Sequence, residues 1–474
     1  MSNEIILRSF INKLYKAIFF ILMILGFSSN LLAEGESKSP LNDEKKQLKL
    51  AKKFLRKGEF KSAESILKNL LAKNPKNTKA KLDLAYIFLK RKNLDKAYDY
   101  AYSVAKEDSK NAYAFAILGA SYLQTGKFSE AKQLLHNALY LDKKVALAWA
   151  AYGMLNFYEN KIDLSLNNLR EAVYRDSSEP DFIFALAQVA SRSEKYLEAA
   201  NAYEKFLHIA PKTDKERRDR IKGLTSFLRY LGKKSSLYDT KGKKITSIKF
   251  DLSNNRPVIK LRLKKKGELL KFVLDTGSGI SVLSKKTAKR LKIKKVATGG
   301  KARALGGDGR FNIVYGFLKK VYIGDVKVLN VPIYIREFHN TKENIDGYIG
   351  LSLISKFITT IDYGNSTFAL QRKNKTSEPV FEKDSMSIPL RLTSSGFLSG
   401  EVKLKGIESP LNFIVDTGAS ISVISEDLAG LDEVNQHILE GKMRVIGAAG
   451  ITENVSSFLS VSYTHLTLPT TPYV

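Results

Sequence analysis

The chain has 474 residues, which is long enough for two or three domains with cores of their own. It contains no cysteine, so disulfides, a thiol nucleophile and cysteine-ligated metals are excluded, and its five histidines leave little for another metal site. The net charge of +30 comes from lysines and arginines dispersed along the chain. We therefore expect solvated lysine faces rather than nucleic-acid binding, and neither a metal nor a cofactor.

The N-terminus predicts export. Arg8, Lys13 and Lys16 precede the apolar run AIFFILMILGF, and a small residue follows at Ala33. This pattern fits a secretory signal within residues 1–33. An uncleaved anchor is the alternative, although the run is short for a membrane span of about 20 residues. We expect the rest of the protein to be periplasmic or extracellular, with membrane contact only if the segment stays uncleaved.

From Glu44 onward, the sequence repeats with a period of 34 residues. Small side chains twelve positions apart predict two helices per repeat that approach each other closely. One column is Ala51, Ala85, Gly119, Gly153 and Ala187, and the other is Ala63, Ala97, Ala131, Ser165 and Ala199.

This pattern resembles the tetratricopeptide repeat (TPR), with Trp149 where the motif often carries an aromatic residue. The resemblance implies an all-α solenoid over 44–233, with five repeats up to residue 213 and a polar, amphipathic capping helix near 214–233. Repeats of this type bind a peptide or a protein partner in their groove. A spacer that positions the next domain is the alternative, and the sequence favours neither.

The sequence pattern changes after residue 233, where the helical repeats end. Residues 234–256 predict a polar linker, and short β-branched runs separated by turn residues then predict an all-β region. Within it, Asp-Thr-Gly occurs twice on matching segments, KFVLDTGSGISVLS around Asp275 and NFIVDTGASISVIS around Asp416. The match predicts a duplicated unit that brings two carboxylates face to face.

Two such carboxylates can hydrolyse an amide without a metal. One accepts a proton from water while the other supplies a proton, and like charges so close cannot both ionise cheaply. Gly277 and Gly418 permit close approach of the two loops. Thr276 and Thr417 are expected to hydrogen-bond across the pair and hold the loops together.

Residues 257–373 resemble one lobe of a retropepsin-like aspartic protease, a type also found in exported bacterial proteins. The matching elements follow FVLDTGSG in the family's order: the Gly-rich flap stretch RALGGDGRFNIVYG, the element DGYIGLSLISKF that braces the catalytic loop, and a closing hairpin in FITTIDYGNSTFAL. The resemblance assigns Gly306 and Gly307 to the flap, and Tyr348, Ile349 and Gly350 to the brace.

A second lobe, at 387–461, repeats this order only in part. SIPLRL, FIVDTGAS and RVIGAAGITENVSSFLSV follow one another, which assigns Gly447 and Gly450 to a second flap. No counterpart of the brace or of the closing hairpin follows. The tail SYTHLTLPTTPYV (462–474) resembles translated sequencing-adapter read-through. We expect a truncated gene product, whose natural form continues and completes the lobe.

The fold class implied is a TPR solenoid followed by two all-β aspartic protease lobes, the second incomplete. The function implied is an exported endopeptidase that hydrolyses polypeptides with water activated by an Asp275/Asp416 dyad. Two alternatives stay open: a non-catalytic scaffold whose lobes only bind, or a protease active as a homodimer of the first lobe. Whether this chain itself is active is open as well.

One difference between the loops lies after each tripeptide, where Ser278 faces Ala419 in the alignment. A hydroxyl at Ser278 could donate to its own carboxylate, which would make Asp275 the more readily ionised partner. The favoured alternative is that both positions simply need a small residue.

Overall fold

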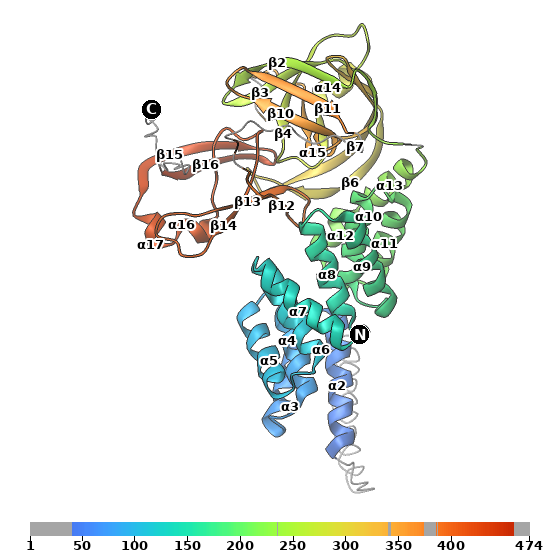
Figure 1. Ribbon diagram of the computed structural model, residues 1–474, viewed down its shortest axis with the longest axis vertical. Coiled ribbons are helices and arrows are strands. Elements are labelled where there is room, and N and C mark those ends of the chain that lie inside the picture. Colours follow the sequence, from blue (N-terminus) through green and yellow to red (C-terminus); the bar gives the residue numbers. More distant parts are fainter. Residues whose placement is uncertain (1–39, 235, 340–342, 374–384, 386, 459–474) are drawn as a thin grey trace, which may run out of the picture.

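The computed structural model describes residues 40–234, 236–339, 343–373, 385 and 387–458. Helices α2 to α13 come first and strands β1 to β16 follow (Figure 1). The prediction of an all-α solenoid followed by a β-rich part is therefore confirmed. The predicted signal or anchor at 1–33 and the tail at 462–474 lie outside the described residues. Within the described ranges, no helix is both long and apolar enough to cross a membrane.

Five helical hairpins form the solenoid. Their bounds are α2 (Pro40–Lys57) with α3 (Phe60–Lys73), α4 (Thr78–Lys90) with α5 (Leu94–Glu107), α6 (Ala112–Gln124) with α7 (Phe128–Leu141), α8 (Ala146–Tyr158) with α9 (Ile162–Arg175), and α10 (Pro180–Arg192) with α11 (Tyr196–Ile209). Asparagines start three of these helices, because the side chains of Asn77, Asn93 and Asn111 accept hydrogen bonds from backbone N–H groups of the first turn.

The small residues of the 34-residue period all lie buried inside the hairpins. A Cβ atom on Gly119 would lie 2.7 Å from Cγ of Leu135, and one on Gly153 would lie 2.8 Å from Cγ of Leu169. At these points the two helices of a hairpin are too close to leave room for a side chain.

The cap of the solenoid differs from the expected single helix at 214–233. It consists of two short helices, α12 (Lys215–Ile221) and α13 (Leu224–Gly232). Gly223 separates them with φ +74°, a left-handed conformation that ends a helix and that glycine adopts without steric cost.

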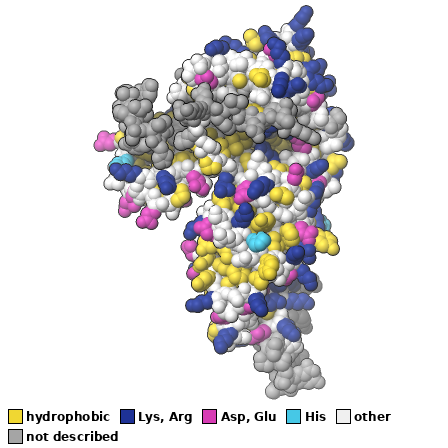
Figure 2. Space-filling model, in the orientation of Figure 1, with side chains coloured by type: hydrophobic (Ala, Val, Ile, Leu, Met, Phe, Trp, Pro, Cys, Tyr) yellow, Lys and Arg dark blue, Asp and Glu magenta, His cyan; other side chains and the backbone are white. Residues whose placement is uncertain are grey.

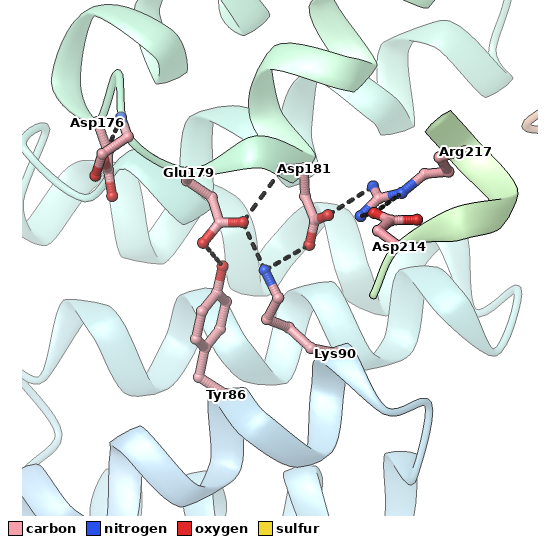
Figure 3. A network of polar contacts seen from close by, with 8 residues as sticks. Tyr86, Lys90, Asp176, Glu179, Asp181, Asp214 and Arg217 are labelled. Carbon is pink, nitrogen blue, oxygen red and sulfur yellow. Dashed lines mark hydrogen bonds and ion pairs between the residues drawn. The ribbon is translucent and has the colours of Figure 1, made fainter. Parts of the chain in front are cut away.

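A polar network joins the second and fifth hairpins to this cap (Figure 3). Tyr86 on α4 donates a hydrogen bond to Glu179 at 2.8 Å. Lys90 Nζ lies 2.5 Å from Glu179 and 2.8 Å from Asp181 at the start of α10, and Arg217 of α12 lies 2.7 Å from Asp181. Helices α4 and α10 are therefore tied together although two hairpins separate them in the sequence.

The first β unit is an eleven-stranded sheet of order β10-β11-β2-β3-β4-β9-β5-β8-β7-β6, with β1 paired to β8. The strands are β1 (Asp239–Gly242), β2 (Ile245–Ser253), β3 (Arg256–Leu261), β4 (Leu270–Asp275), β5 (Ser281–Ser284), β6 (Lys295–Arg303), β7 (Arg310–Ile323), β8 (Val326–Arg336), β9 (Gly347–Gly350), β10 (Phe357–Asp362) and β11 (Thr367–Arg372). Two short helices, α14 (Lys285–Arg290) and α15 (Leu351–Ile354), complete it.

The segment 234–256 is not a linker, which corrects the sequence-based prediction. Strand β2 pairs with both β3 and β11, and β1 pairs with β8. The many polar residues of this segment suggested a linker, but they belong to a strand that is buried on one face only. Strand β2 buries alternate residues, such as Thr246 and Phe250, and leaves its other face exposed. The first β unit therefore begins before residue 257.

The second β unit is smaller. Its parts are a three-stranded sheet of β12 (Arg391–Leu392), β13 (Leu398–Val402) and β14 (Leu411–Ile414), two short helices, α16 (Glu426–Ala429) and α17 (Asp432–Asn435), and a hairpin of β15 (Ile438–Gly447) and β16 (Gly450–Phe458).

Both β units contact the solenoid. Phe227 of α13 is buried in the core of the first unit, with its ring centroid 4.5 Å from that of Tyr315. Leu392 of β12 is buried in the solenoid core, and Cζ of Arg391 lies 4.3 Å from the ring centroid of Phe128. The three parts thus share their apolar cores. Lysine and arginine side chains spread over helical and β parts alike on the face shown in Figure 2.

Candidate active site

The two Asp-Thr-Gly loops follow strands β4 and β14 and have the same local geometry. The N–H of Ser278 donates to the carbonyl of Asp275 at 3.3 Å, and the N–H of Ala419 donates to the carbonyl of Asp416 at 3.4 Å. The matched sequences therefore give matched turns. The structure brings these turns together in space.

Reciprocal threonine hydrogen bonds join the two loops. The hydroxyl of Thr276 donates to the carbonyl of Val415 at 2.6 Å and accepts from the N–H of Thr417 at 3.0 Å. In return, the hydroxyl of Thr417 donates to the carbonyl of Leu274 at 2.8 Å and accepts from the N–H of Thr276 at 3.3 Å. Four hydrogen bonds related by a pseudo-twofold axis thus fix the relative position of the loops.

The glycines let each loop pass directly beside the opposite carboxylate. A Cβ atom on Gly418 would lie 2.7 Å from Cγ of Asp275, and one on Gly277 would overlap the carboxylate of Asp416. Any side chain at either glycine would displace an aspartate. The third residue of each tripeptide is therefore fixed by contact with the other loop.

The brace holds only the first loop. Strand β9 runs parallel to β4, with Tyr348 and Ile349 opposite Val273 and Leu274, and Gly350 opposite Asp275. The N–H of Leu351 donates to the carbonyl of Ser278 at 2.7 Å. This arrangement buries the residues before Asp275 completely.

In the second unit, β14 pairs only with β13 among the described residues. Val273 and Leu274 are 0% exposed, whereas Ile414 and Val415, at the matching positions, are 50% and 40% exposed. Asp416 therefore depends mainly on the threonine hydrogen bonds to Thr276 for its position.

Two hairpins meet above the loops as flaps. Gly306 and Gly307 lie in the turn between β6 and β7, and Gly447 and Gly450 flank the turn between β15 and β16. The N–H of Gly307 donates to the carbonyl of Ile451 at 3.2 Å, and the N–H of Ala449 donates to the carbonyl of Leu305 at 2.9 Å. The flap tips are thus hydrogen-bonded to each other across the two units.

A cleft of about 1950 Å³ contains both aspartates and the flap residues Leu305 and Gly447. The solenoid also lines it, through residues such as Gln188 and Arg192 of α10. The helical part therefore forms one wall of the candidate active site.

The dyad favours one shared proton. Burial of Asp275, followed by the charge of Asp416 and a hydrogen bond with it, raises the pKa of Asp275 to about 8. The guanidinium of Arg336 acts in the opposite direction and does not cancel these effects. Asp275 therefore holds a proton at neutral pH.

The structure does not contain the hydrogen bond from Ser278 to its own carboxylate on which the expected easier ionisation of Asp275 rested. The hydroxyl of Ser278 donates to the carbonyl of Ile280 at 2.9 Å rather than to the Asp275 carboxylate. Sequence comparison of the loops could not show the burial of Asp275 under β9 and the opposite loop.

Sequence reasoning missed Arg336, the last residue of β8, which lines the cleft and influences Asp275. No local motif marks it, because it enters the site only through the pairing of β8 with β5 and β7. Over the described ranges, no three His, Cys, Asp or Glu residues gather in a way that could hold a metal ion.

Comparisons with known proteins agree with this architecture. Residues 259–353 match the family model described as Aspartyl protease, and residues 54–100 match the one described as Tetratricopeptide repeat. The chain therefore combines tetratricopeptide repeats with an aspartyl protease-like β domain. Asp275 and the brace fall inside the first match, and Asp416 falls outside it. No curated protein gives a significant match.

Several solved structures are similar to part of this chain. They include a thermophilic TPR protein of Thermus thermophilus (20% identity, covering 40% of this chain and 99% of that chain, TM-score 0.33), PilF of Pseudomonas aeruginosa (17%, 40% and 86%, TM-score 0.29) and MamA of Desulfovibrio magneticus RS-1 (17%, 35% and 94%, TM-score 0.25). These identities and TM-scores are too low to carry an argument about what this chain binds.

Proposed function

We propose that the protein is an aspartic endopeptidase in which Asp275 and Asp416 of one chain form the catalytic dyad. The supporting observation is the set of four threonine hydrogen bonds that hold the two loops face to face. Such a pair is suited to hydrolysis of peptide bonds, because neighbouring carboxylates that share one proton supply a base and an acid together.

The protonation of Asp275 assigns the roles. Asp416 accepts a proton from a water molecule between the carboxylates, and the water oxygen forms a bond to the scissile carbonyl carbon. Asp275 gives its proton to the carbonyl oxygen, which yields a tetrahedral diol. The proton on Asp416 then passes to the departing nitrogen as the C–N bond breaks, and one diol hydroxyl returns its proton to Asp275.

The shape of the cleft supports a polypeptide substrate. The flaps cross above the dyad, and the walls extend to solenoid residues such as Gln188 and Arg192. A polypeptide in extended form would pass between the flap tips and the carboxylates. The repeats thus have a role in guiding a substrate or partner, and the N-terminal pattern Arg8 to Ala33 supports action outside the cytoplasm.

The direct test replaces Asp275 by Asn, which keeps the size of the side chain and removes its acid function. Cleavage of a peptide library should fall by about 100-fold or more, the range expected when general acid–base catalysis is lost. Asp251→Asn is the matched control, since this exposed aspartate pairs with Lys260 away from the cleft. If the unmodified chain cleaves no peptide, the non-catalytic scaffold replaces this proposal.

A further inference from the structure

Arg336 places a cation in the cleft among three aromatic rings. Its Cζ atom lies 4.8 Å from the ring centroid of Phe338, 5.5 Å from that of Tyr348 and 5.8 Å from that of Phe311. The rings shield the guanidinium from water, and this burial lowers the pKa of Arg336. A partly desolvated cation interacts more strongly with an anion than a surface cation does.

Apart from the charge interaction with Asp275, no carboxylate in the described part of the segment between β8 and β9 pairs with this cation. The three acidic residues described between β8 and β9 all have other basic partners. These pairs are Glu337 with Lys285 at 2.9 Å, Glu343 with Arg256, and Asp346 with Arg290 at 3.0 Å.

Of the other arginines that line the cleft, Arg192, Arg220 and Arg310 also lack a carboxylate partner among the described residues, whereas Arg303 and Arg444 have one. Arg303 pairs with Glu216 at 2.6 Å, and Arg444 pairs with Glu453 at 3.0 Å. Arg336 has no carboxylate within ion-pair distance in the part of the chain that the structure describes. Its charge is therefore available to a ligand in the cleft.

The hydrogen bonds of Arg336 leave donors for that ligand. Nη1 donates to the main-chain carbonyls of Glu337 at 3.2 Å and of Ala448 at 3.3 Å. A guanidinium has five N–H groups, and Nε and Nη2 have no partner among the described residues. Ala448 lies at the tip of the second flap, so Arg336 contacts this flap and also lines the cleft that contains the dyad.

We infer that Arg336 forms a subsite for a carboxylate, and that the polypeptide hydrolysed by the dyad carries an Asp or Glu side chain close to the scissile bond. A carboxylate can accept two parallel hydrogen bonds from a guanidinium. The inference rests on the proposed function. A side chain is favoured over a C-terminal carboxylate, because the cleft continues past Arg336 to α10 and to β14, so an extended chain has room on both sides.

The experiment measures which peptides the full chain cleaves from a library with amidated C-termini, and then kcat/KM for Glu-containing peptides and their Gln counterparts. Asp or Glu should be enriched at one position within two residues of the cleaved bond. The Glu peptide should be preferred by about 10- to 100-fold, the factor expected for charge-assisted hydrogen bonds.

Substitutions at Arg336 then identify the recognising group. Arg336→Gln should abolish the preference for Glu over Gln while the Gln peptide is still cleaved, and Arg336→Glu should shift the preference to Lys or Arg. Arg310→Ala is the matched control, because Arg310 is an exposed arginine that lines the same cleft, and it should keep the acidic preference. Unchanged melting temperatures establish that the variants are folded.

The outcomes separate the two proposals. Cleavage without an acidic preference, or a preference that survives Arg336→Gln, contradicts the subsite and leaves the protease intact. An acidic preference that is absent from the amidated library and appears only in a matched library with free C-termini also contradicts it, because the recognised carboxylate is then terminal. No cleavage of any peptide contradicts both the subsite and the proposed function.

Discussion

At the scale of single residues, the raised pKa of Asp275 sets the pH range of the proposed reaction. The mechanism needs a proton on this carboxyl, and its pKa of about 8 keeps the proton there through neutral pH. We predict that kcat/KM falls as the pH rises through about 8. A pH profile with a fixed peptide checks this, and full activity at pH 10 would contradict it.

Arg336 should shift this profile. Its positive charge lowers the pKa of Asp275, so removal of the charge in Arg336→Gln lets that pKa rise further. The alkaline limb of the profile should therefore move to higher pH. Arg310→Ala, which removes a charge not among the causes of the Asp275 shift, should leave the limb in place. If the alkaline limb moved to lower pH in Arg336→Gln, the positive charge of Arg336 would not be lowering the pKa of Asp275.

Stability should depend on pH through the same carboxyl. Between about pH 4, where an unfolded Asp titrates, and about pH 8, the folded state keeps a proton on Asp275 that the unfolded state has lost. The contribution of Asp275 to the free energy of unfolding should therefore decrease as the pH rises across that window. Denaturant titrations of wild type and Asp275→Asn measure it. The variant should show a flatter dependence, and an identical slope would count against the assignment.

The threonines are the next residue-scale test. Thr276 is a buried residue, 8% exposed, and Thr276→Ala removes a hydroxyl that makes two of the four hydrogen bonds between the loops. We expect a loss of about 1–3 kcal/mol in the free energy of unfolding, as for buried hydrogen-bond partners. Peptide cleavage should fall at the same time because Asp416 loses its support. Thr276→Ser, which keeps the hydroxyl, is the control, and equal behaviour of Ala and Ser would contradict the role.

Much of the site could be predicted from the local sequence, and Arg336 could not. The tripeptides are adjacent residues with recognisable roles, so the pairing of Thr276 with Thr417 followed from one turn repeated twice. The protonation of Asp275 depends on burial by β9 and by the opposite loop, which no local pattern contains. Arg336 is a single cation at a strand end, and only the complete sheet brings it to the cleft.

At the scale of elements, the helical hairpins depend on small residues at fixed positions. In Gly119→Val the new Cβ would lie 2.7 Å from Cγ of Leu135. Overpacking of this kind typically costs about 1–3 kcal/mol. Thermal unfolding should show lower stability for Gly119→Val and little change for Gln133→Val, which adds the same side chain at an exposed position of α7. Equal stability of Gly119→Val and wild type would mean that the helices can move apart.

The elements also show where pattern reading fails. The 34-residue period defined the five hairpins because every repeat buries the same columns. The segment 234–256 was interpreted as a linker because β2 is polar on one face, and its pairing with β11 joins residues more than 110 positions apart. Gly223 looked like an ordinary residue of one helix, yet it divides the cap into α12 and α13.

At the scale of the whole molecule, the solenoid and the first β unit share a core at α13. Phe227 is 1% exposed, and its ring packs against that of Tyr315 with the centroids 4.5 Å apart. Phe227→Ala should cost about 3–5 kcal/mol and reduce hydrogen-exchange protection in both α13 and the first β unit.

Phe206→Ala is the matched control, because Phe206 is equally buried but packs within the solenoid, 5.1 Å from Phe184. Its effect on exchange should concentrate in the helical hairpins. If Phe206→Ala and Phe227→Ala reduced hydrogen-exchange protection in the first β unit equally, the solenoid and this unit would not be coupled specifically through α13.

The packing of Phe227 into the core of the first β unit could not be predicted from the sequence. An apolar residue at this position is expected on the buried face of any capping helix, with or without a neighbouring domain. The order of the parts was predictable, since each carries its own repeat or motif. The contribution of α10 and α12 to the wall of the cleft was not predictable, because it depends on how separately patterned parts pack together.

The central claim is that the catalytic pair forms within one chain, and the most direct measurement is peptide cleavage by Asp416→Asn. The threonine hydrogen bonds place Asp416 opposite Asp275 of the same chain. The account predicts that Asp416→Asn lowers kcat/KM by about 100-fold or more, as Asp275→Asn does. Retention of wild-type activity by Asp416→Asn, together with its loss in Asp275→Asn, would contradict the account and assign the activity to a homodimer of the first β unit.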